Sequence, residues 1–360
     1  MKLSLSRTQL LGIVALVLVL AGVAVYALFY RVQTSTQPQL PAALDGTAPE
    51  YPITRLPLAG ELTGSDAEIS GLAWYGDYLI ILPQYPDWAS SGSDGKLFAI
   101  PKQQIIAVLD GTSTAAITPQ AIVLVAPGLK AAIKGFQGYE AIGFHGDQAF
   151  LTIEAGDGQM QGYLVAGEIK PDLSTLIIDT TTVVALNTPA QIENATFESL
   201  VVLDDAVGVI YEANGKNVNP QPKLKLFDFA LRPQPDRSFP AIEYRITDAT
   251  PLAADNTFWA INYFFPDREN KYNPAEDMLR TTYGTGPTHA QSSYVERLVE
   301  LQLTDTGVSL VNTAPLLLQL AGGDDARNWE GIARLDDRGF LLMTDKFPET
   351  ILAFVSVGRG

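Results

Sequence analysis

A short phrase recurs five times along this chain. The copies begin at Ile69, Tyr139, Phe197, Ala249 and Trp329, and the copy at Ala249 is the weakest. A polar turn and a second apolar run follow each copy, which is the pattern of a β-hairpin. A unit that repeats at intervals of tens of residues is typical of a stacked array or a propeller. This repeat constrains the fold more than any other feature of the sequence.

Each repeat unit contains runs for four strands, except the fifth, which contains three. The fourth unit is expected to begin with a strand at 250–254, and 241–246 is expected to end the third. The segment 51–62 has no partner of its own, and pairing it with the fifth unit closes a ring without exposed sheet edges. The sequence therefore predicts an all-β, five-bladed β-propeller over residues 51–360. A six-bladed ring is an alternative, because the long insertion at 265–293 in the fourth unit could contain another blade. An open β-sandwich is a further alternative.

The composition excludes several classes of function. The net charge of −16 argues against nucleic-acid binding, which needs clustered Lys and Arg. The chain has no cysteine and only two histidines, so a thiolate nucleophile is excluded and a zinc site is not expected. An exported domain without disulfides is more typical of a bacterium than of an animal secretory protein.

The N-terminus predicts a membrane anchor. Lys2 and Arg7 precede a long apolar stretch, and Arg31 follows it. About twenty apolar residues span a bilayer, whereas the apolar part of a cleavable signal peptide has about 7–15. We expect a cytoplasmic segment 1–8, a transmembrane signal anchor 9–30 and a tether 31–50, with the propeller on the extracytoplasmic side. Small residues at 21–24 leave cleavage open.

One position of the repeat is polar in every copy. Its occupants are Ser70, Glu140, Glu198, Thr250 and Glu330. The first strand of each blade lines the central channel, so these side chains are expected to form a ring. Close carboxylates repel by about a few kcal/mol per pair, so they must take up protons, basic partners or a cation. Oxygen ligands alone suit Ca²⁺, although each carboxylate has the alternative of bonding backbone amides of the next blade.

The second strand of each blade ends in another polar residue. These are Gln84, Glu154, Glu212, Asn262 and Asp345, which would form a wider ring at the mouth of the same channel. For a hydrolytic site, Glu154, Glu212 and Asp345 are the candidate general bases. Arg327 and Lys346 are candidate phosphate contacts, with Asn262 and Gln84 as further substrate contacts.

The channel ring resembles the central calcium ring of the calcium-dependent apyrase family. That family ring has hydroxyls in blades one and four and Glu in the other three, and this sequence differs by Thr250 in place of Ser. The resemblance implies a five-bladed propeller, secreted or membrane-anchored, that hydrolyses nucleoside di- and triphosphates with Ca²⁺.

A second resemblance is local. The runs Asn-Trp-Glu-Gly-Ile at 328–332, Gly-Phe-Leu-Leu at 339–342, Thr-Asp at 344–345 and Phe-Glu-Ser-Leu at 197–200 are similar to phrases of the phytase-like ("esterase-like activity of phytase") family. This resemblance implies a bacterial exported propeller with phosphate- or ester-hydrolysing activity.

Two functional hypotheses follow. The first is a calcium-dependent hydrolase of small phosphoesters or phosphoanhydrides, in which the metal polarises a phosphoryl oxygen or binds the attacking water. The second is a non-enzymatic binding or assembly module with a structural metal and a protein partner. The insertion at 265–293 would be a lid over the mouth or a docking loop.

Overall fold

The computed structural model describes residues 48–88, 94–266, 269–322 and 326–357. The fold described below is that of the unit 43–360. The predicted segment 1–8, anchor 9–30 and nearly all of the tether 31–50 lie outside the described residues. Within the described ranges, none of the helices combines the length and the hydrophobicity that a membrane crossing needs.

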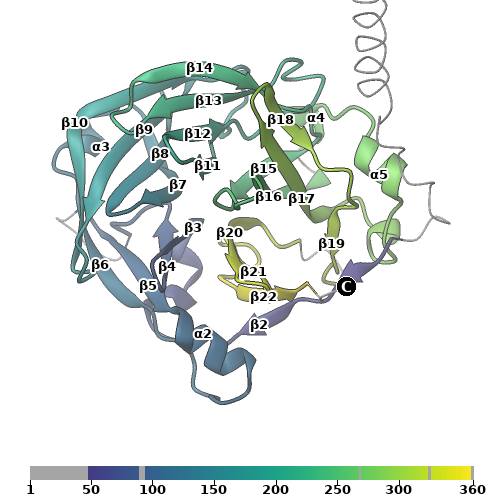
Figure 1. Cartoon of the computed structure of the whole chain (residues 1–360), viewed down its shortest axis with the longest axis horizontal. Coiled ribbons are helices and arrows are strands. Elements are labelled where there is room, and N and C mark those ends of the chain that lie inside the picture. Colours follow the sequence, from purple (N-terminus) through teal and green to yellow (C-terminus); the bar gives the residue numbers. More distant parts are fainter. Residues whose placement is uncertain (1–47, 89–93, 267–268, 323–325, 358–360) are drawn as a thin grey trace, which may run out of the picture. The chain divides into compact units, whose positions relative to one another are not determined.

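Five inner strands surround the centre of this unit, one from each repeat (Figure 1). They are β3 (Ile69–Tyr75), β7 (Phe136–His145), β11 (Ser199–Val202), β15 (Arg245–Ala249) and β20 (Trp329–Leu335). Consecutive inner strands contact one another in this order, and β20 contacts β3 again. Most of their residues are buried, as expected for strands covered on both faces. The structure thus supports the predicted all-β propeller.

Each inner strand begins an antiparallel run that leads outward, and we call each run a blade. Blade 1 continues with β4 (Tyr78–Pro83), β5 (Lys96–Pro101) and β6 (Gln120–Val125). Blade 2 continues with β8 (Gln148–Gly156), β9 (Met160–Ile169) and β10 (Thr175–Asn187). Blade 3 continues with β12 (Ala206–Ile210), β13 (Lys223–Asp228) and β14 (Pro233–Ser238). Blade 4 continues with β16 (Thr257–Phe264) and β17 (Val295–Thr304), which pairs with both β18 (Gly307–Leu310) and β19 (Leu316–Leu318).

Blade 5 combines the two ends of the unit. It runs from β20 to β21 (Gly339–Thr344) and β22 (Leu352–Ser356), and β22 pairs antiparallel with β2 (Thr54–Leu56). Outer strands also join neighbouring blades, because β10 pairs in parallel with β6. The short strand β1 (Glu50–Tyr51) pairs in parallel with β19 of blade 4. These pairings cover sheet edges that would otherwise offer free backbone groups.

Helices occupy the connections between strands. They are α2 (Lys102–Leu109), α3 (Leu129–Ala132), α4 (Glu269–Tyr272) and α5 (Met278–Tyr283), with 3₁₀ turns at Glu61–Thr63, Ser65–Ala67 and His289–Gln291. The last two α-helices belong to the insertion between β16 and β17. The predicted insertion 265–293 is therefore a structured connection within blade 4.

The hydrophobic core lies between the faces of adjacent blades. Leu72 of blade 1 packs in one cluster with Leu341 of blade 5, and Phe150 of blade 2 packs in another with Phe197 before blade 3. Inner strands approach each other so closely that glycine is required at Gly331. A Cβ atom there would lie 2.6 Å from the Leu72 side chain.

The inner strand of blade 4 differs from the prediction. The sequence phrase predicts a strand at 250–254, but β15 ends at Ala249 and includes residues that were expected in the outer strand of blade 3. Pro251 explains the difference, because proline has no N–H to donate within a sheet. The inner strand therefore lies before this proline, and its first residue is Arg245.

Candidate functional site

Three inner strands carry the predicted ring residue at the same irregularity of the sheet. The ladder of β3 shifts between Ile69 and Gly71, so Ser70 is the extra residue. The same shift brackets Glu140 in β7 and Glu330 in β20. A bulge of this kind leaves one residue unpaired and redirects its side chain. Glu198 directly precedes β11, and the ladder of that strand begins at Ser199. Glu198 thus has the position that Glu330 has in β20, where the ladder resumes at Gly331.

In blade 4 the corresponding residue is Asp248. The ladder of β15 shifts between Ile246 and Ala249, and Asp248 directly precedes the residue that resumes it, as Glu330 precedes Gly331 in β20. The preceding residue, Thr247, donates its hydroxyl to the carbonyl of Trp329 at 2.6 Å. Thr250 lies beyond β15, where its hydroxyl donates to the Pro251 carbonyl and accepts from the Trp259 amide. The fourth position of the predicted ring is therefore held by Asp248 and not by Thr250.

Arg245 joins the carboxylates of three positions. Its Nη2 lies 3.1 Å from Glu198 Oε2 and 2.9 Å from Glu330 Oε1, and its Nε donates to Glu212 Oε1. Its Nη1 donates to the side-chain oxygen of Asn328 at 3.0 Å. Such charge-assisted hydrogen bonds are the strong ones in proteins. The structure thus provides one of the basic partners that a ring of carboxylates needs.

Sequence reasoning missed Arg245. The available signal was its position three residues before Asp248, at the start of the inner strand of blade 4. Because that strand is expected at 250–254, Arg245 is assigned by the sequence to the outer strand of the third blade. An alignment of the hairpin that ends at Phe264, rather than of the weak phrase, would have exposed it.

Residues of the second predicted ring join the same network. Gln84 donates to Glu140 Oε1 at 3.0 Å. Asn328 donates to Glu330 Oε1 at 2.7 Å and to Asp345 Oδ2 at 3.2 Å. Ring one and ring two are therefore hydrogen-bonded to each other. We call the combined group the axial cluster; its members are Ser70, Gln84, Glu140, Glu154, Glu198, Glu212, Arg245, Asn328, Glu330 and Asp345.

Several buried oxygens of this cluster lack a hydrogen-bond partner among the described residues. They are both carboxylate oxygens of Glu154, Oε2 of Glu212, Oδ1 of Asp345 and the hydroxyl of Ser70. The hydroxyls of Thr152 and Thr196 share this condition. Buried polar groups are rarely left unsatisfied, so each of these atoms calls for a proton, a water molecule, an ion or a ligand.

Five carboxyls of the cluster have raised pKa values: Glu140, Glu154, Glu198, Glu330 and Asp345. Burial, followed by the charge of Glu212, raises the pKa of Glu154 to about 7, although the nearby Thr196 hydroxyl opposes the rise. Burial, followed by the charge of Asp345, raises the pKa of Glu330 to about 8, against the effect of Arg245. Burial also raises the pKa values of Glu140, Glu198 and Asp345. The cluster therefore holds protons near neutral pH.

The predicted phosphate and substrate contacts have other partners. Arg327 forms a buried ion pair with Glu296 at 2.9 Å. The side-chain amide of Asn262 donates to the carbonyls of Glu243 and Arg245 and accepts from Arg297. Lys346 is 2.9 Å from Glu68 and is partly exposed. Of the four predicted substrate contacts, Gln84 is the one whose hydrogen bond to a ring carboxylate brings it into the cluster.

The donor atoms of the cluster suit Ca²⁺, but their arrangement is not that of a coordination shell. Carboxylate and hydroxyl oxygens are the ligands that calcium prefers. Within the described ranges, however, no three Asp, Glu, His or Cys side chains are placed to hold a metal together. Arg245 instead occupies the space between Glu198, Glu212 and Glu330.

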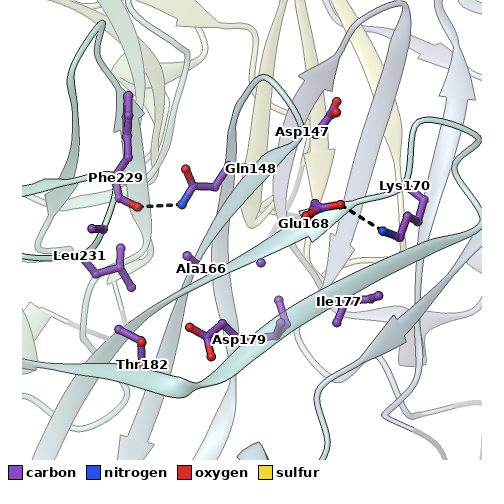
Figure 2. A pocket seen from close by; sticks show the side chains of 13 residues that line it. Asp147, Gln148, Ala166, Glu168, Lys170, Ile177, Asp179, Thr182, Phe229 and Leu231 are labelled. Carbon is purple, nitrogen blue, oxygen red and sulfur yellow. Dashed lines mark hydrogen bonds and ion pairs between the residues drawn. The ribbon is translucent and has the colours of Figure 1, made fainter.

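A separate hollow of about 840 Å³ lies on the surface between blades 2 and 3 (Figure 2). The side chain of Gln148 donates to the Phe229 carbonyl at 2.7 Å across it, and Lys170 pairs with Glu168 at 3.0 Å. Asp147, Asp179 and Ile177 also line it. None of the residues that line it belongs to the predicted sites.

Comparisons with known proteins show no family for this chain. No family model matches the chain, and no curated protein matches it. Among solved structures, a GH43_1 enzyme from Xanthomonas citri complexed with xylose is 12% identical with a TM-score of 0.44, covering 85% of this chain and 91% of that one. The soluble aldose sugar dehydrogenase of Escherichia coli is 12% identical with a TM-score of 0.42, covering 82% and 98%.

The glutaminyl cyclase of Myxococcus xanthus is 9% identical with a TM-score of 0.40, covering 86% of this chain and all of that one. Such distant similarity carries no argument about activity. The comparisons do not show the calcium-dependent apyrase family or the phytase-like family. The candidate site therefore stands on its own contacts, with Arg245 bound to the carboxylates at the centre of the inner strands.

Proposed function

We propose that the five blades form a five-bladed propeller whose axial cluster binds a hard cation, with Ca²⁺ as the ion that suits its donors. The observation that carries the proposal is Glu154. It is 1% exposed, and its carboxylate oxygens meet no donor at full hydrogen-bond geometry among the described residues, with the Thr196 hydroxyl as the nearby donor that lowers its pKa. A buried carboxylate without a partner is costly unless a proton or a cation compensates it.

The charge balance of the cluster supports a missing cation. Six acidic groups influence one another there: Glu140, Glu154, Glu198, Glu212, Glu330 and Asp345. Arg245 is the basic group hydrogen-bonded among them, while Lys271 and Lys346 act from the margin. With Glu68, which pairs with Lys346, and the buried Asp248, which Glu330 influences, eight acids face three bases even when both lysines are counted. Protons at Glu154 and Glu330 reduce this excess, and a divalent cation would displace them.

The unpartnered oxygens are the candidate ligands, and because no three of the described acidic side chains are placed to hold a metal together, these side chains would have to turn toward the ion on binding. Glu154, Oε2 of Glu212, Oδ1 of Asp345 and the Ser70 hydroxyl are the donors that the Arg245 network leaves over. Glu198 and Glu330 are engaged by Arg245, so we assign them to charge compensation rather than to the ion. When bound, Ca²⁺ would neutralise the cluster and act as a Lewis acid toward a ligand oxygen.

Hydrolysis of a phosphoester or phosphoanhydride is the second candidate activity. Glu154 would be its proton-transfer group, because a carboxyl with a pKa near 7 is suited to general acid–base work. The hydrolase is less well supported, because Arg327, Lys346 and Asn262, the predicted substrate contacts, bind other groups of the protein. We therefore favour a binding or assembly module whose cation is structural over the hydrolase.

We also propose that the propeller lies outside the cytoplasm. Residues 9–30 would anchor it as a single-pass protein with a cytoplasmic N-terminus, because their length and hydrophobicity suit a bilayer. An extracytoplasmic space supplies more free calcium than a cytoplasm, in which weak calcium sites stay empty.

Calorimetric titration of the metal-free protein with Ca²⁺ tests the binding. We expect a single saturable site that chelator removes and that Glu154→Gln weakens by about tenfold or more. Asp305→Asn, which neutralises an exposed turn carboxylate, is the matched control and should bind as wild type. Absence of saturable binding by the wild-type protein would refute the proposal. Phosphate release from nucleotides and phytate decides between the two activities, since turnover that Glu154→Gln abolishes would establish the hydrolase.

A further inference from the structure

The surface hollow between blades 2 and 3 results from an irregularity in the outer strands of blade 2. The ladder between β9 and β10 shifts between Ile178 and Val183. Over that interval, Ala166 of β9 alone lies opposite the four residues 179–182 of β10. A strand that bulges in this way bends away from its partner, and the small side chain of Ala166 leaves the opened space unfilled. We call this hollow of about 840 Å³ the lateral groove.

One wall of the lateral groove comes from the turn between β13 and β14 of blade 3. Phe229 and Leu231 of this turn lie on one side of Ala166 in Figure 2, and all three pack in one hydrophobic cluster. Asp228 holds the turn, because its carboxylate accepts hydrogen bonds from two backbone amides of the turn and from the side chain of Arg232. The shape of this apolar wall is therefore fixed before any partner binds.

The other side of the lateral groove is open and acidic. Three exposed carboxylates line it, those of Asp147, Glu168 and Asp179. Among the described residues of the lining, Lys170 is the basic one, and it pairs with Glu168 at 3.0 Å. The lining therefore carries a net negative charge. It also includes Ile177, a large apolar residue that is 41% exposed.

An apolar wall beside a row of carboxylates complements an apolar side chain that lies next to Lys or Arg. The apolar side chain would cover Ile177 and Phe229, which is favourable because it removes apolar surface from water. The basic side chain would meet the carboxylates on the open side, where complementary charge speeds association and selects the partner. A small molecule would gain less, because a groove that is open on one side cannot enclose about 70–90% of a ligand's surface as compact ligand pockets do.

We propose that the lateral groove docks an extended segment of a partner protein in which an apolar side chain lies next to Lys or Arg. The proposal goes beyond the cation binding of the axial cluster and does not rest on it, because none of the residues that line the groove belongs to that cluster. It gives a binding or assembly module a defined surface and a partner of defined chemistry.

Fluorescence anisotropy with short labelled peptides tests the docking. The probes carry a central Leu, Ile or Phe flanked on both sides by Lys or Arg, and matched peptides carry Glu in place of the basic residues. We expect saturable binding of basic peptides at physiological ionic strength and no binding of the acidic ones. Absence of saturable binding by every basic peptide would overturn the proposal.

A triple variant removes the charge of the groove without removing its hydrogen bonds. It replaces the three acids by their amides: Asp147→Asn, Glu168→Gln and Asp179→Asn. Each amide keeps the side-chain oxygen that accepts a hydrogen bond in the wild type. We expect the basic peptides to bind this variant about tenfold more weakly, because each exposed charge makes a modest contribution and three are lost.

The matched control removes the same number of exposed charges from connections outside the groove: Asp204→Asn, Asp205→Asn and Asp305→Asn. It should bind the basic peptides as the wild type does. Equal weakening in the two triple variants would overturn the proposal, because it would show attraction by the net charge of the protein alone.

Filling the groove tests its apolar part. Ala166→Leu places a larger side chain opposite residues 179–182 and should weaken peptide binding by about tenfold or more, the order of one lost apolar side-chain contact. Ala185→Leu enlarges an exposed alanine of β10 that does not line the groove, and it should bind as the wild type does. Urea unfolding compares the folding of both variants. Unchanged peptide affinity of folded Ala166→Leu would overturn the proposal.

Two further measurements distinguish other occupants. Hexylammonium that binds the wild-type protein as tightly as the best peptide would assign the groove to a small amphiphilic cation. Self-association of the wild-type protein in sedimentation equilibrium, abolished by Ala166→Leu, would assign the groove to a second copy of this chain. Either result would overturn the proposal.

Discussion

Asp248 accepts a hydrogen bond from the backbone amide of Ile332 at 2.8 Å, and this bond ties blade 4 to blade 5 at the centre of the ring. Its second contact across the ring is a longer bond of 3.4 Å from the amide of Leu72 in blade 1. The Asp248 carboxyl also accepts from the next amide, that of Ala249. A single buried side chain thus connects three inner strands, which supports a closed arrangement of the blades.

Asp248→Ala is expected to destabilise the fold by about 2–4 kcal/mol, because it leaves buried backbone donors without an acceptor. Asp248→Asn should cost less, since one acceptor oxygen remains. Urea unfolding with fluorescence detection measures both. Unfolding of Asp248→Ala at the wild-type midpoint would mean that the blades do not depend on this connection.

Arg245→Met is expected to lower the free energy of unfolding by about 3–5 kcal/mol, the cost of removing one partner from a buried ion pair. The carboxylates of Glu198 and Glu212 would lose their shared cation. Arg245→Lys should recover only part of the loss, because an ammonium cannot serve the separated acceptors that a guanidinium spans. Chemical denaturation near pH 7 compares the three proteins. A lysine variant as stable as wild type would show that charge alone matters here.

The sequence predicted the positions of this site better than their chemistry. Ser70, Glu140 and Glu330 could be aligned because the phrase and the hairpin after it are regular in those repeats, and the structure gives them one common bulge. The predicted inner strand of blade 4 was wrong because the phrase there is weak and the strand ends before Pro251. That shift concealed Arg245.

The repeat could not predict contacts between side chains of distant segments. Arg327 and Asn262 lie where the repeat predicts them. Their side chains, however, bind residues of β17: Arg327 pairs with Glu296, and Asn262 accepts from Arg297. The position of Tyr272, whose hydroxyl donates to Glu212 at 2.8 Å, depends on the path of an insertion that has no counterpart in the other repeats. The sequence shows which residues face the centre, whereas the partners of each residue depend on side chains from other blades.

Stability is expected to fall as the pH rises from about 5 to 8 in the absence of divalent cations. The pKa values of Glu154 and Glu330 are raised from 4.5 to about 7 and about 8, so the folded protein binds protons that the unfolded chain has released. Stabilisation by these protons is complete below the unfolded pKa and is lost as the pH passes the folded values. Unfolding midpoints measured across this range should decline and level off above pH 8. Glu154→Gln should flatten the decline, and a slope unchanged in that variant would contradict the assignment.

Glu50 is expected to cause a loss of stability at acid pH. Its carboxylate accepts from the amides of Thr288 and His289, from the Thr288 hydroxyl and from the His289 ring. Burial alone would raise the pKa of Glu50, but these bonds outweigh it and lower the pKa below 4.5. Because the folded pKa is depressed, stabilisation by Glu50 is present above pH 4.5 and is lost as the pH falls through the folded value.

Glu50→Gln should therefore lower the free energy of unfolding by about 1–3 kcal/mol at pH 7, the cost of weakening several buried hydrogen bonds to a charge. The loss should diminish below pH 4, where the wild-type carboxyl is protonated as well. Glu61→Gln is the control, because its pair with Lys96 is half-exposed and surface pairs contribute less than about 1 kcal/mol. Urea unfolding at pH 7 and at pH 3.5 gives the comparison. Equal losses for Glu50→Gln and Glu61→Gln at pH 7 would show that this contact does not hold β1 to blade 4.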